Sequence, residues 1–201
     1  MIGSTGSGKS TLINLIPRYY DVTKGSVKVD GVDVRDMTQK ELRDKLGYVP
    51  QKGVLFSGTI DSNIRYGKPE ITDAQVKEAA EVAQATEFID TKPEKYESPV
   101  SQGGTNVSGG QKQRLSIARA IAKDPEIFIF DDSFSALDFK TDSQLRKALK
   151  EYTKDATTVI VAQRISTILG ADQIIVLDDG HMAGIGTHKE LMANCEVYQL
   201  S

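Results

Sequence analysis

Cysteine is nearly absent from this sequence, since Cys195 is the only one among 201 residues. A single cysteine cannot form a disulfide bond within the chain. With two histidines and no C-x-x-C pair, the sequence also offers no cysteine–histidine metal cluster. These absences exclude an internal disulfide framework and a zinc-type cluster, and they are typical of a protein from a reducing compartment.

Long apolar runs and an excess of charge of one sign are lacking as well. No stretch approaches the roughly 20 apolar residues that a membrane-spanning helix needs, and the N-terminus lacks the basic-then-apolar order of a signal peptide. The 25 basic and 28 acidic residues give a net charge of -3, so we expect no nucleic-acid partner. The sequence therefore predicts a polypeptide that is soluble when taken alone.

Helix and strand patterns alternate along the chain, without internal repeats or low-complexity linkers. Hydrophobic residues make up 39% of the sequence, which is enough to bury a core, and the length indicates one domain. The apolar runs at 126–131 and 157–162 are typical of central parallel strands. We therefore expect an α/β fold with a mainly parallel core sheet flanked by helices. The predicted boundaries are one domain over 1–201, with its core in 1–67 and 121–201 and an inserted helical subdomain at 68–120.

Short residue pairs mark the turns and the helix starts. Asp30-Gly31 and Asp179-Gly180 lie next to alternating apolar residues, which predicts two β-hairpins. A helix is expected over 9–16, and another over 109–122 with Leu115, Ala118, Ile121 and Ala122 facing inward. Three capping boxes predict further helix starts at Thr38 with Glu41, Thr72 with Gln75, and Thr187 with Glu190.

The first eleven residues contain a complete phosphate-loop motif. Its glycines let backbone N–H groups converge on phosphate oxygens, Lys9 reaches the β and γ phosphates, and Ser10 offers a hydroxyl to Mg²⁺. Asp131, at the end of an apolar run, is placed to bind the Mg²⁺ shell of the nucleotide. The motif predicts a P-loop NTPase whose nucleotide-binding residues are Gly3, Ser4, Thr5, Gly6, Ser7, Gly8, Lys9, Ser10 and Thr11.

The phosphate loop begins unusually close to the start of the chain. A loop of this kind needs a strand in front of it, and Met1 and Ile2 are the only residues that precede it here. We therefore expect the chain to be an N-terminally truncated piece of a longer protein. The loss of preceding strands would expose sheet edge and apolar surface, so we also expect the isolated 201 residues to fold poorly.

The segment NVSGGQKQR, from Asn106 to Arg114, makes the chain resemble the nucleotide-binding domain of ATP-binding cassette (ABC) transporters, most closely the exporter type. Gln51 in YVPQ resembles the Q-loop of that family, and SALD, ending at Asp138, resembles its D-loop. The stretches LFSGTIDSNIRYG and GTHKELM are similar to exporters in particular. The resemblance covers nearly the whole chain. It identifies the signature motif as Ser108, Gly109, Gly110 and Gln111.

What the resemblance implies goes beyond one chain. Two such domains sandwich two ATP molecules head to tail, so that the signature motif of one domain completes the pocket of the other. The expected cofactors are ATP and Mg²⁺, with Ser10, Gln51 and Asp131 as the metal-binding residues. The expected partners are a second ABC nucleotide-binding domain and the transmembrane domains of a parent transporter, at the cytoplasmic face of the cell membrane. The Q-loop and the segment after it would contact those transmembrane domains.

Two positions depart from the family pattern. Where hydrolytic pockets of the family place a glutamate after the Mg²⁺-binding aspartate, this chain has Asp132, which is shorter by about 1.5 Å per bond removed. A general base must come within roughly 3 Å of its proton, and a misplacement near 1 Å can cost about a hundredfold in rate. Where the family has its switch histidine, this chain has Gln163, which can donate a hydrogen bond but cannot carry positive charge.

These departures lead to three hypotheses. The first is an ATP-binding subunit of a heterodimeric exporter, with a hydrolytically impaired pocket of its own and a signature motif that serves its partner. The second is a homodimeric exporter with slow hydrolysis. The third is an ABC ATPase of the translation or DNA-repair kind that has no transport function. Asp132 and Gln163 are the residues whose chemistry separates the first two.

Overall fold

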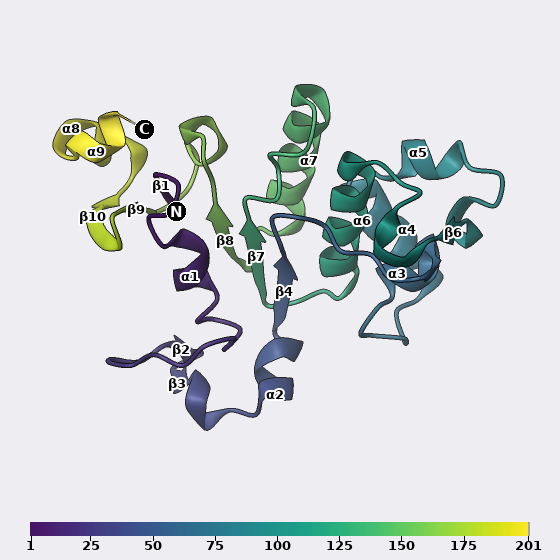
Figure 1. Ribbon diagram of the computed structural model, residues 1–201, viewed down its shortest axis with the longest axis horizontal. Helices are drawn as coiled ribbons and strands as arrows, with labels where there is room; N and C mark the ends of the chain where they lie inside the picture. The colour runs from purple at the N-terminus through teal and green to yellow at the C-terminus, as the bar shows by residue number, and fades with distance from the viewer. Residues whose placement is uncertain (201) are drawn as a thin grey trace. The chain divides into compact units, whose positions relative to one another are not determined.

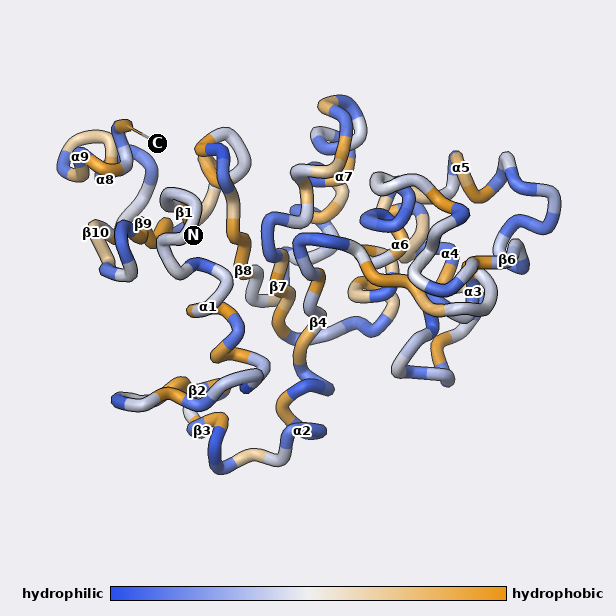
Figure 2. Tube along the Cα trace, in the orientation of Figure 1, coloured by the Kyte–Doolittle hydropathy of each residue, from blue (hydrophilic) through white to orange (hydrophobic). Residues whose placement is uncertain are grey.

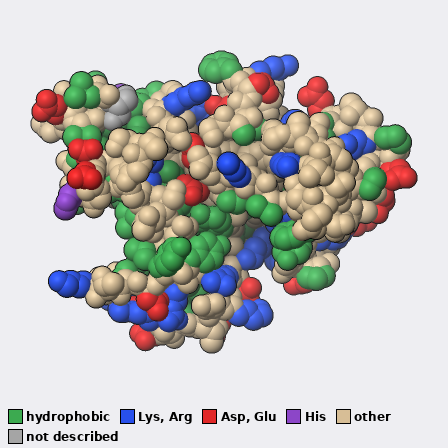
Figure 3. All heavy atoms as spheres, in the orientation of Figure 1, with side chains coloured by type: hydrophobic (Ala, Val, Ile, Leu, Met, Phe, Trp, Pro, Cys, Tyr) green, Lys and Arg blue, Asp and Glu red, His purple; other side chains and the backbone are tan. Residues whose placement is uncertain are grey.

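A computed structural model describes residues 1–200 of the chain (Figure 1). The chain divides into two compact units, Met1–Asp44 with Val159–Ser201, and Lys45–Thr158. Within the described residues, no helix combines the length and the apolar content that crossing a membrane requires. Figure 3 shows both basic and acidic side chains on the visible face.

The first unit contains a three-stranded sheet in the order β1-β9-β10. Strand β1 runs parallel to β9, with Ile2 opposite Val176, and β10 runs antiparallel to β9. The Asp179-Gly180 turn has positive φ at both residues (43° and 76°), which confirms the predicted hairpin. The elements of this unit are β1 (Ile2–Gly3), α1 (Lys9–Ile13), β2 (Lys28–Val29), β3 (Val32–Asp33), η1 (Val34–Asp36), α2 (Gln39–Asp44), η4 (Ile165–Thr167), β9 (Ile174–Asp178), β10 (His181–Gly186), α8 (His188–Asn194) and α9 (Glu196–Gln199).

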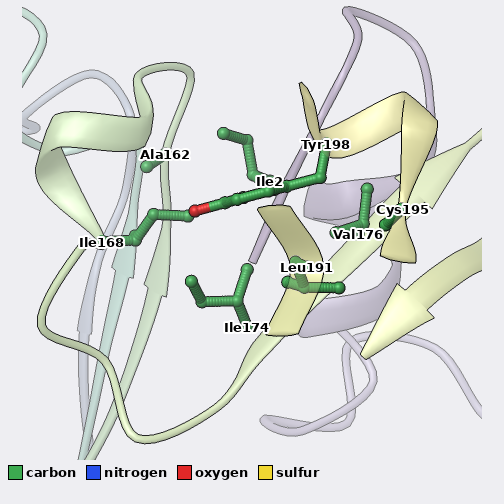
Figure 4. Packing of buried hydrophobic residues seen from close by; sticks show 8 residues of the cluster. All are labelled: Ile2, Ala162, Ile168, Ile174, Val176, Leu191, Cys195 and Tyr198. Atoms are coloured by element: carbon green, nitrogen blue, oxygen red, sulfur yellow. The ribbon is translucent and has the colours of Figure 1, made fainter. Parts of the chain in front are cut away.

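A compact core holds the first unit together (Figure 4). Tyr198 on α9 is fully buried in it. Its hydroxyl lies 2.9 Å from Nδ1 of His188, so this buried hydroxyl has a hydrogen-bond partner. Cys195 belongs to the same cluster, where a free thiol behaves as a small apolar residue. The buried residues are Ile2, Ala162, Ile168, Ile174, Val176, Leu191, Cys195 and Tyr198.

The second unit combines a parallel strand pair with a group of helices. Strands β4 and β7 pair in parallel, with Val49 opposite Phe130, and Figure 2 shows the hydrophobic run along β7. The signature helix α6 is the centre of the helical part, since α3 and α4 both pack against it. The elements are β4 (Leu46–Val49), β5 (Gly58–Thr59), α3 (Ile60–Ile64), α4 (Asp73–Val82), α5 (Thr86–Asp90), η2 (Lys95–Glu97), β6 (Pro99–Val100), η3 (Gln102–Gly104), α6 (Gly109–Ala122), β7 (Ile127–Asp131) and α7 (Phe139–Tyr152), with β8 (Thr157–Val161) beginning in this unit.

Most local predictions are confirmed, and one helix is shorter than predicted. The hairpin at Asp30-Gly31 forms, and the capping pairs of α2, α4 and α8 exchange the expected hydrogen bonds. Helix α1 ends at Ile13 instead of residue 16, because the α conformation is disfavoured just before Pro17 and the chain closes with tighter turns. The predicted boundaries of the helical subdomain stay a prediction.

The capping box of α8 gives a first testable prediction. Oγ1 of Thr187 accepts the N–H of Glu190 at 3.3 Å, and the Glu190 carboxylate accepts the N–H of Thr187 at 2.8 Å. We expect Thr187→Ala to lower the free energy of unfolding by about 1 kcal/mol, measured by urea denaturation at pH 7. The exposed Thr23→Ala is the matched control, and an equal effect of the two variants would contradict the role of the cap.

The same capping box predicts a pH dependence. The hydrogen bonds from Thr187 hold the pKa of Glu190 below its ordinary value of 4.5. Because the folded-state pKa is lowered, the contribution of this carboxylate to stability is complete above the ordinary value and is lost as the pH falls below it. The destabilisation caused by Thr187→Ala should therefore shrink as the pH is lowered through this range.

Candidate functional site

The phosphate loop lies in the first unit, between β1 and α1. Two of its glycines are required by the backbone. A Cβ at Gly3 would lie 2.1 Å from the carbonyl oxygen of Leu177 on the neighbouring strand, so no side chain fits there. Gly8, directly before α1, has φ 92°, a left-handed conformation that glycine adopts without strain. The sequence therefore forms a tight turn from strand to helix, as the motif predicts.

The side chain of Lys9 is hydrogen-bonded to the backbone of this loop. Its Nζ donates hydrogen bonds to the carbonyl oxygens of Gly3 at 2.8 Å and Ser4 at 2.7 Å, and it lies 3.4 Å from Oγ of Ser7. The ammonium group is thus held at the loop by neutral carbonyl groups that a negatively charged phosphate can replace. Around it, the side chains of Ser4, Thr5, Ser10 and Thr11 are exposed, whereas Ser7 is buried. The loop is open to a ligand on the side of these exposed residues.

Gln163 belongs to the same unit and lies close to the start of the loop strand. The N–H of Ala162 donates to the carbonyl oxygen of Met1 at 3.0 Å. The residue that follows the C-terminal end of β8 is therefore hydrogen-bonded to the residue just before the strand that leads into the loop. Gln163 follows directly and is exposed. The backbone therefore brings Gln163 next to the strand that carries the phosphate loop, as its predicted role requires.

The acidic residues of the site lie in the second unit, at the end of β7. Asp131 and Asp132 are 7% and 8% exposed, and the hydroxyl of Tyr48 lies 3.4 Å from Oδ2 of Asp131. Nε2 of Gln51 donates to Oδ2 of Asp132 at 3.0 Å. Because β4 and β7 are parallel, their carboxyl ends meet at one edge, which brings Gln51 to the two aspartates. Tyr48 was not among the predicted site residues, although its place one residue before the end of β4 is a usable signal.

The backbone at Asp132 is unusual for a residue with a side chain. Its φ is 46°, in the left-handed region that aspartate tolerates better than most residues. The hydroxyl of Ser135 donates to the carbonyl oxygen of Asp132 at 3.0 Å, and that of Ser133 to Val49 at 2.8 Å. These bonds hold the turn after β7, so the short carboxylate of Asp132 stays directed to Gln51.

The chemistry of these side chains suits a hard cation. Gln51, Asp131 and Asp132 offer carboxylate and amide oxygens, which are the donors that Mg²⁺ prefers. Within residues 1–200, no cluster of three or more histidine, cysteine, aspartate or glutamate side chains forms a metal cage. Mg²⁺ is held in many phosphate sites by one or two carboxylates together with phosphate oxygens of the substrate. The residues therefore fit a cation that arrives with a nucleotide.

The signature residues form an exposed helix start on α6. Oγ of Ser108 accepts the N–H of Gln111 at 3.2 Å, and Oε1 of Gln111 accepts the N–H of Ser108 at 3.1 Å. Ser108 and Gly109 are exposed, and a Cβ at Gly109 would meet nothing within 4 Å. The motif therefore has both a structural role, as a helix cap, and an open surface at the N-terminus of a long helix.

Asp138, predicted as part of the D-loop, also has a structural role. Its carboxylate accepts the N–H of Thr141 at 3.0 Å and the hydroxyl of Thr141 at 2.7 Å, which makes it the N-cap of α7. These two hydrogen bonds hold the pKa of Asp138 below its ordinary value. Neither this cap nor the helix that it begins was predicted from the sequence.

Comparison with known proteins matches the chain to the family described as ABC transporter over residues 1–135. An uncharacterized ABC transporter ATP-binding protein of Mycobacterium tuberculosis is 50% identical over 98% of this chain and 34% of its own length. A Staphylococcus aureus protein provisionally named a multidrug export ATP-binding/permease protein is 48% identical, over 98% of this chain and 34% of its own length. The chain spans about a third of the length of these relatives.

A solved structure agrees with the sequence comparisons. A bacterial Atm1-family ABC exporter with ATP bound superimposes with a TM-score of 0.94 at 40% identity, over 99% of this chain and 35% of the exporter chain. This similarity confirms the predicted fold class, a P-loop NTPase of mixed α/β type with a parallel sheet. Since the family match extends over more than half of its residues, the chain belongs to the ABC transporter family.

Proposed function

We propose that the chain is the ATP-binding domain of an ABC exporter, which couples ATP binding and hydrolysis to efflux across a membrane. The observation that carries this proposal is the similarity, over 99% of the chain, to an Atm1-family exporter with ATP bound. The open phosphate loop, with Lys9 held over it, supports the same function. The domain would lie at the cytoplasmic face of the cell membrane, attached to the transmembrane domains of a parent transporter.

In this function the residues of the chain divide into a binding and a reacting set. The backbone of the phosphate loop and the ammonium group of Lys9 hold the triphosphate, and Ser10, Gln51 and Asp131 are the proposed residues of the Mg²⁺ site. When bound, Mg²⁺ neutralises charge on the β and γ phosphates. Asp132 accepts a proton from the attacking water, and Gln163 donates a hydrogen bond to the γ-phosphate.

A second nucleotide-binding domain completes the proposal. The exposed start of α6, at Ser108 and Gly109, is a donor-rich helix N-terminus suited to an anion. One chain needs only one site for a γ-phosphate, and the phosphate loop already supplies it. We therefore assign the signature residues to the ATP pocket shared with a partner domain, and Asp138 to the D-loop.

The finer part of the proposal is that the pocket of this chain is impaired and that the partner is a different subunit. Asp132 has a short side chain, and its carboxylate is engaged by Gln51 at 3.0 Å. Gln163 cannot become an imidazolium, so it adds no positive charge at the phosphate. Binding residues are retained while both reacting residues are weakened. This combination suits a subunit that retains ATP and lends its signature motif to a competent partner.

Lys9→Met tests the nucleotide-binding function. The hydrogen bond from a charged donor to phosphate is worth about 1.5–3 kcal/mol, so its loss should weaken the binding of ATP by about tenfold or more. The dissociation constant of a fluorescent ATP analogue, mant-ATP, would be measured with the protein as its gene encodes it. Lys24→Met, at an exposed lysine of the same unit, is the control and should bind normally. Equal affinities of the wild type and Lys9→Met would contradict the proposed function.

A further inference from the structure

The signature helix carries one buried amide that the sequence motifs do not explain. Gln113, one turn into α6, is 1% exposed. Its Oε1 accepts the N–H of Gly53 at 2.9 Å, and its Nε2 donates to the carbonyl oxygen of Pro50 at 3.0 Å. Both ends of the side chain are therefore used on the backbone of one short segment. That segment carries Gln51 between its two anchored residues.

The segment also approaches α6 very closely. A Cβ at Gly53 would lie 2.8 Å from the carbonyl oxygen of Lys112 and 2.8 Å from Oγ of Ser116. Only glycine allows the backbone to lie against the helix at this distance. The hydrogen bond between Gly53 and Gln113 forms at this close approach, so loss of the amide would allow the segment to lift away from the helix.

The anchored segment leads to the proposed cation site. Gln51 is one residue after Pro50, and its side chain reaches Oδ2 of Asp132 at 3.0 Å. The strand end before it is held separately, because the hydroxyl of Ser133 donates to the carbonyl oxygen of Val49 at 2.8 Å. The bonds from Ser133 and Gln113 therefore fix the backbone on both sides of Gln51. Without Gln113, the backbone after Gln51 loses its side-chain anchor on α6.

We propose that Gln113 is a positioning residue, which sets the amide of Gln51 against Asp132 and so prepares the oxygen of Gln51 for Mg²⁺. This inference rests on the proposed function, because it concerns the cation of the same nucleotide site. It extends that function by joining the signature helix to the Q-loop through one side chain. A merely structural glutamine would stabilise the fold without a specific effect on the cation.

The test measures the binding of the cation separately from the binding of the nucleotide. In the protein as its gene encodes it, binding of mant-ATP would be titrated with Mg²⁺, and also measured in EDTA. Loss of a side chain that orients a metal ligand typically costs about 10–100-fold in metal affinity. We expect Gln113→Met to raise the Mg²⁺ concentration for half-saturation by about tenfold. The affinity for mant-ATP in EDTA should stay within about twofold of the wild type, because the phosphate loop is unchanged.

Two further variants make the test specific. Ser116→Ala is the matched control, because Ser116 is buried on the same helix, faces the same segment, and its hydroxyl has no hydrogen-bond partner among the described residues. It should leave the Mg²⁺ titration unchanged. Gln51→Ala should raise the Mg²⁺ requirement by itself. Adding Gln113→Met to Gln51→Ala should then change little, because the two side chains act through one ligand.

Several results would overturn the inference. A Gln113→Met protein whose Mg²⁺ titration superimposes on the wild type would do so, as would an equal loss of affinity in EDTA. Independent, additive effects of the Gln51 and Gln113 variants would also contradict it. If Gln113→Met does not fold, Gln113→Glu serves in its place, since it keeps an acceptor for Gly53 and loses the donor to Pro50. A wild type that does not bind mant-ATP would instead defeat the proposed function, and the inference with it.

Discussion

The double substitution Asp132→Glu with Gln163→His should raise the rate of ATP hydrolysis by about a hundredfold. The added methylene lets the carboxylate reach further toward the attacking water, and a histidine can carry positive charge at the γ-phosphate. In the present chain the carboxylate of Asp132 is held at Gln51, 3.0 Å away, by a turn that its neighbours fix. The change of side-chain length is therefore not compensated by movement of the backbone.

Turnover would be measured by phosphate release, with the protein as its gene encodes it, alone and together with the proposed partner subunit. Glutamate tolerates the left-handed backbone of Asp132 (φ 46°) less well than aspartate, so each variant also needs a denaturation curve. Asp124→Glu is the matched control, because Asp124 has a similar φ of 51° and lies outside the site. Asp124→Glu should reproduce the backbone strain of a glutamate at positive φ without raising the rate of ATP hydrolysis.

The outcome separates the alternatives that the sequence leaves open. A hundredfold gain, together with slow turnover of the wild type alone, supports an impaired pocket, and a rise in turnover on adding the proposed partner subunit would favour the heterodimer over the homodimer with slow hydrolysis. A rate within about twofold of the wild type would show that Asp132 and Gln163 do not limit hydrolysis. Brisk hydrolysis by the wild-type chain alone would contradict the impaired pocket directly.

The parts of the site that the sequence predicts are those formed by neighbouring residues. The phosphate loop is a continuous motif whose glycines are required locally, at Gly3 by the strand beside it and at Gly8 by its φ. The capping boxes are likewise read within four residues. The apolar run that ends at Asp131 indicates strand β7, but its parallel pairing with β4, which brings Gln51 to Asp131 and Asp132, does not follow from the apolar runs.

The parts that were missed depend on weak patterns or on contacts distant in sequence. Helix α7 is an exception, because Leu145, Ala148, Leu149 and Tyr152 recur at the spacing i, i+3, i+4 and i+7, so its apolar periodicity was readable although only Leu145 and Leu149 are buried. Helix α3 has five residues and begins at Thr59, whose capping partner is Ser62 instead of the expected glutamate or glutamine. The bonds from Gln113 to Pro50 and Gly53 span about sixty residues, and no local pattern announces them.

Arg119 on α6 also makes contacts with residues distant in the sequence. Its replacement should lower the free energy of unfolding more than any other substitution proposed for this protein. The guanidinium donates to the carbonyl oxygens of Asn63 at 2.8 Å and Val54 at 2.9 Å, and to Oδ1 of Asn63 at 3.0 Å. It also lies over the rings of Phe56 and Tyr66, at 5.3 and 5.4 Å from their centroids. Burial lowers the pKa of Arg119 to about 10, so the group stays charged at pH 7.

We expect Arg119→Met to lower the free energy of unfolding by about 3 kcal/mol or more, because hydrogen bonds to charged groups contribute about 1.5–3 kcal/mol each. Methionine retains most of the apolar stem, so the loss reports on the guanidinium. Arg119→Lys should recover only part of it, since a compact ammonium cannot reproduce the planar fork that reaches two residues. Urea denaturation at pH 7 gives the free energy of unfolding of the wild type and of the two variants.

Arg114→Met provides the comparison on the same helix. Arg114 donates one hydrogen bond, to the carbonyl oxygen of Gln84 at 2.7 Å, and lies over the ring of Phe88. Its loss should therefore cost about 1–2 kcal/mol, clearly less than the loss of Arg119. Equal costs at the two positions would contradict the multiple anchoring of Arg119. The stretch that Arg119 contacts, from Val54 to Tyr66, overlaps the stretch that resembles exporters in particular. The side chain of Arg119 therefore also holds the surface that is proposed to contact the transmembrane domains.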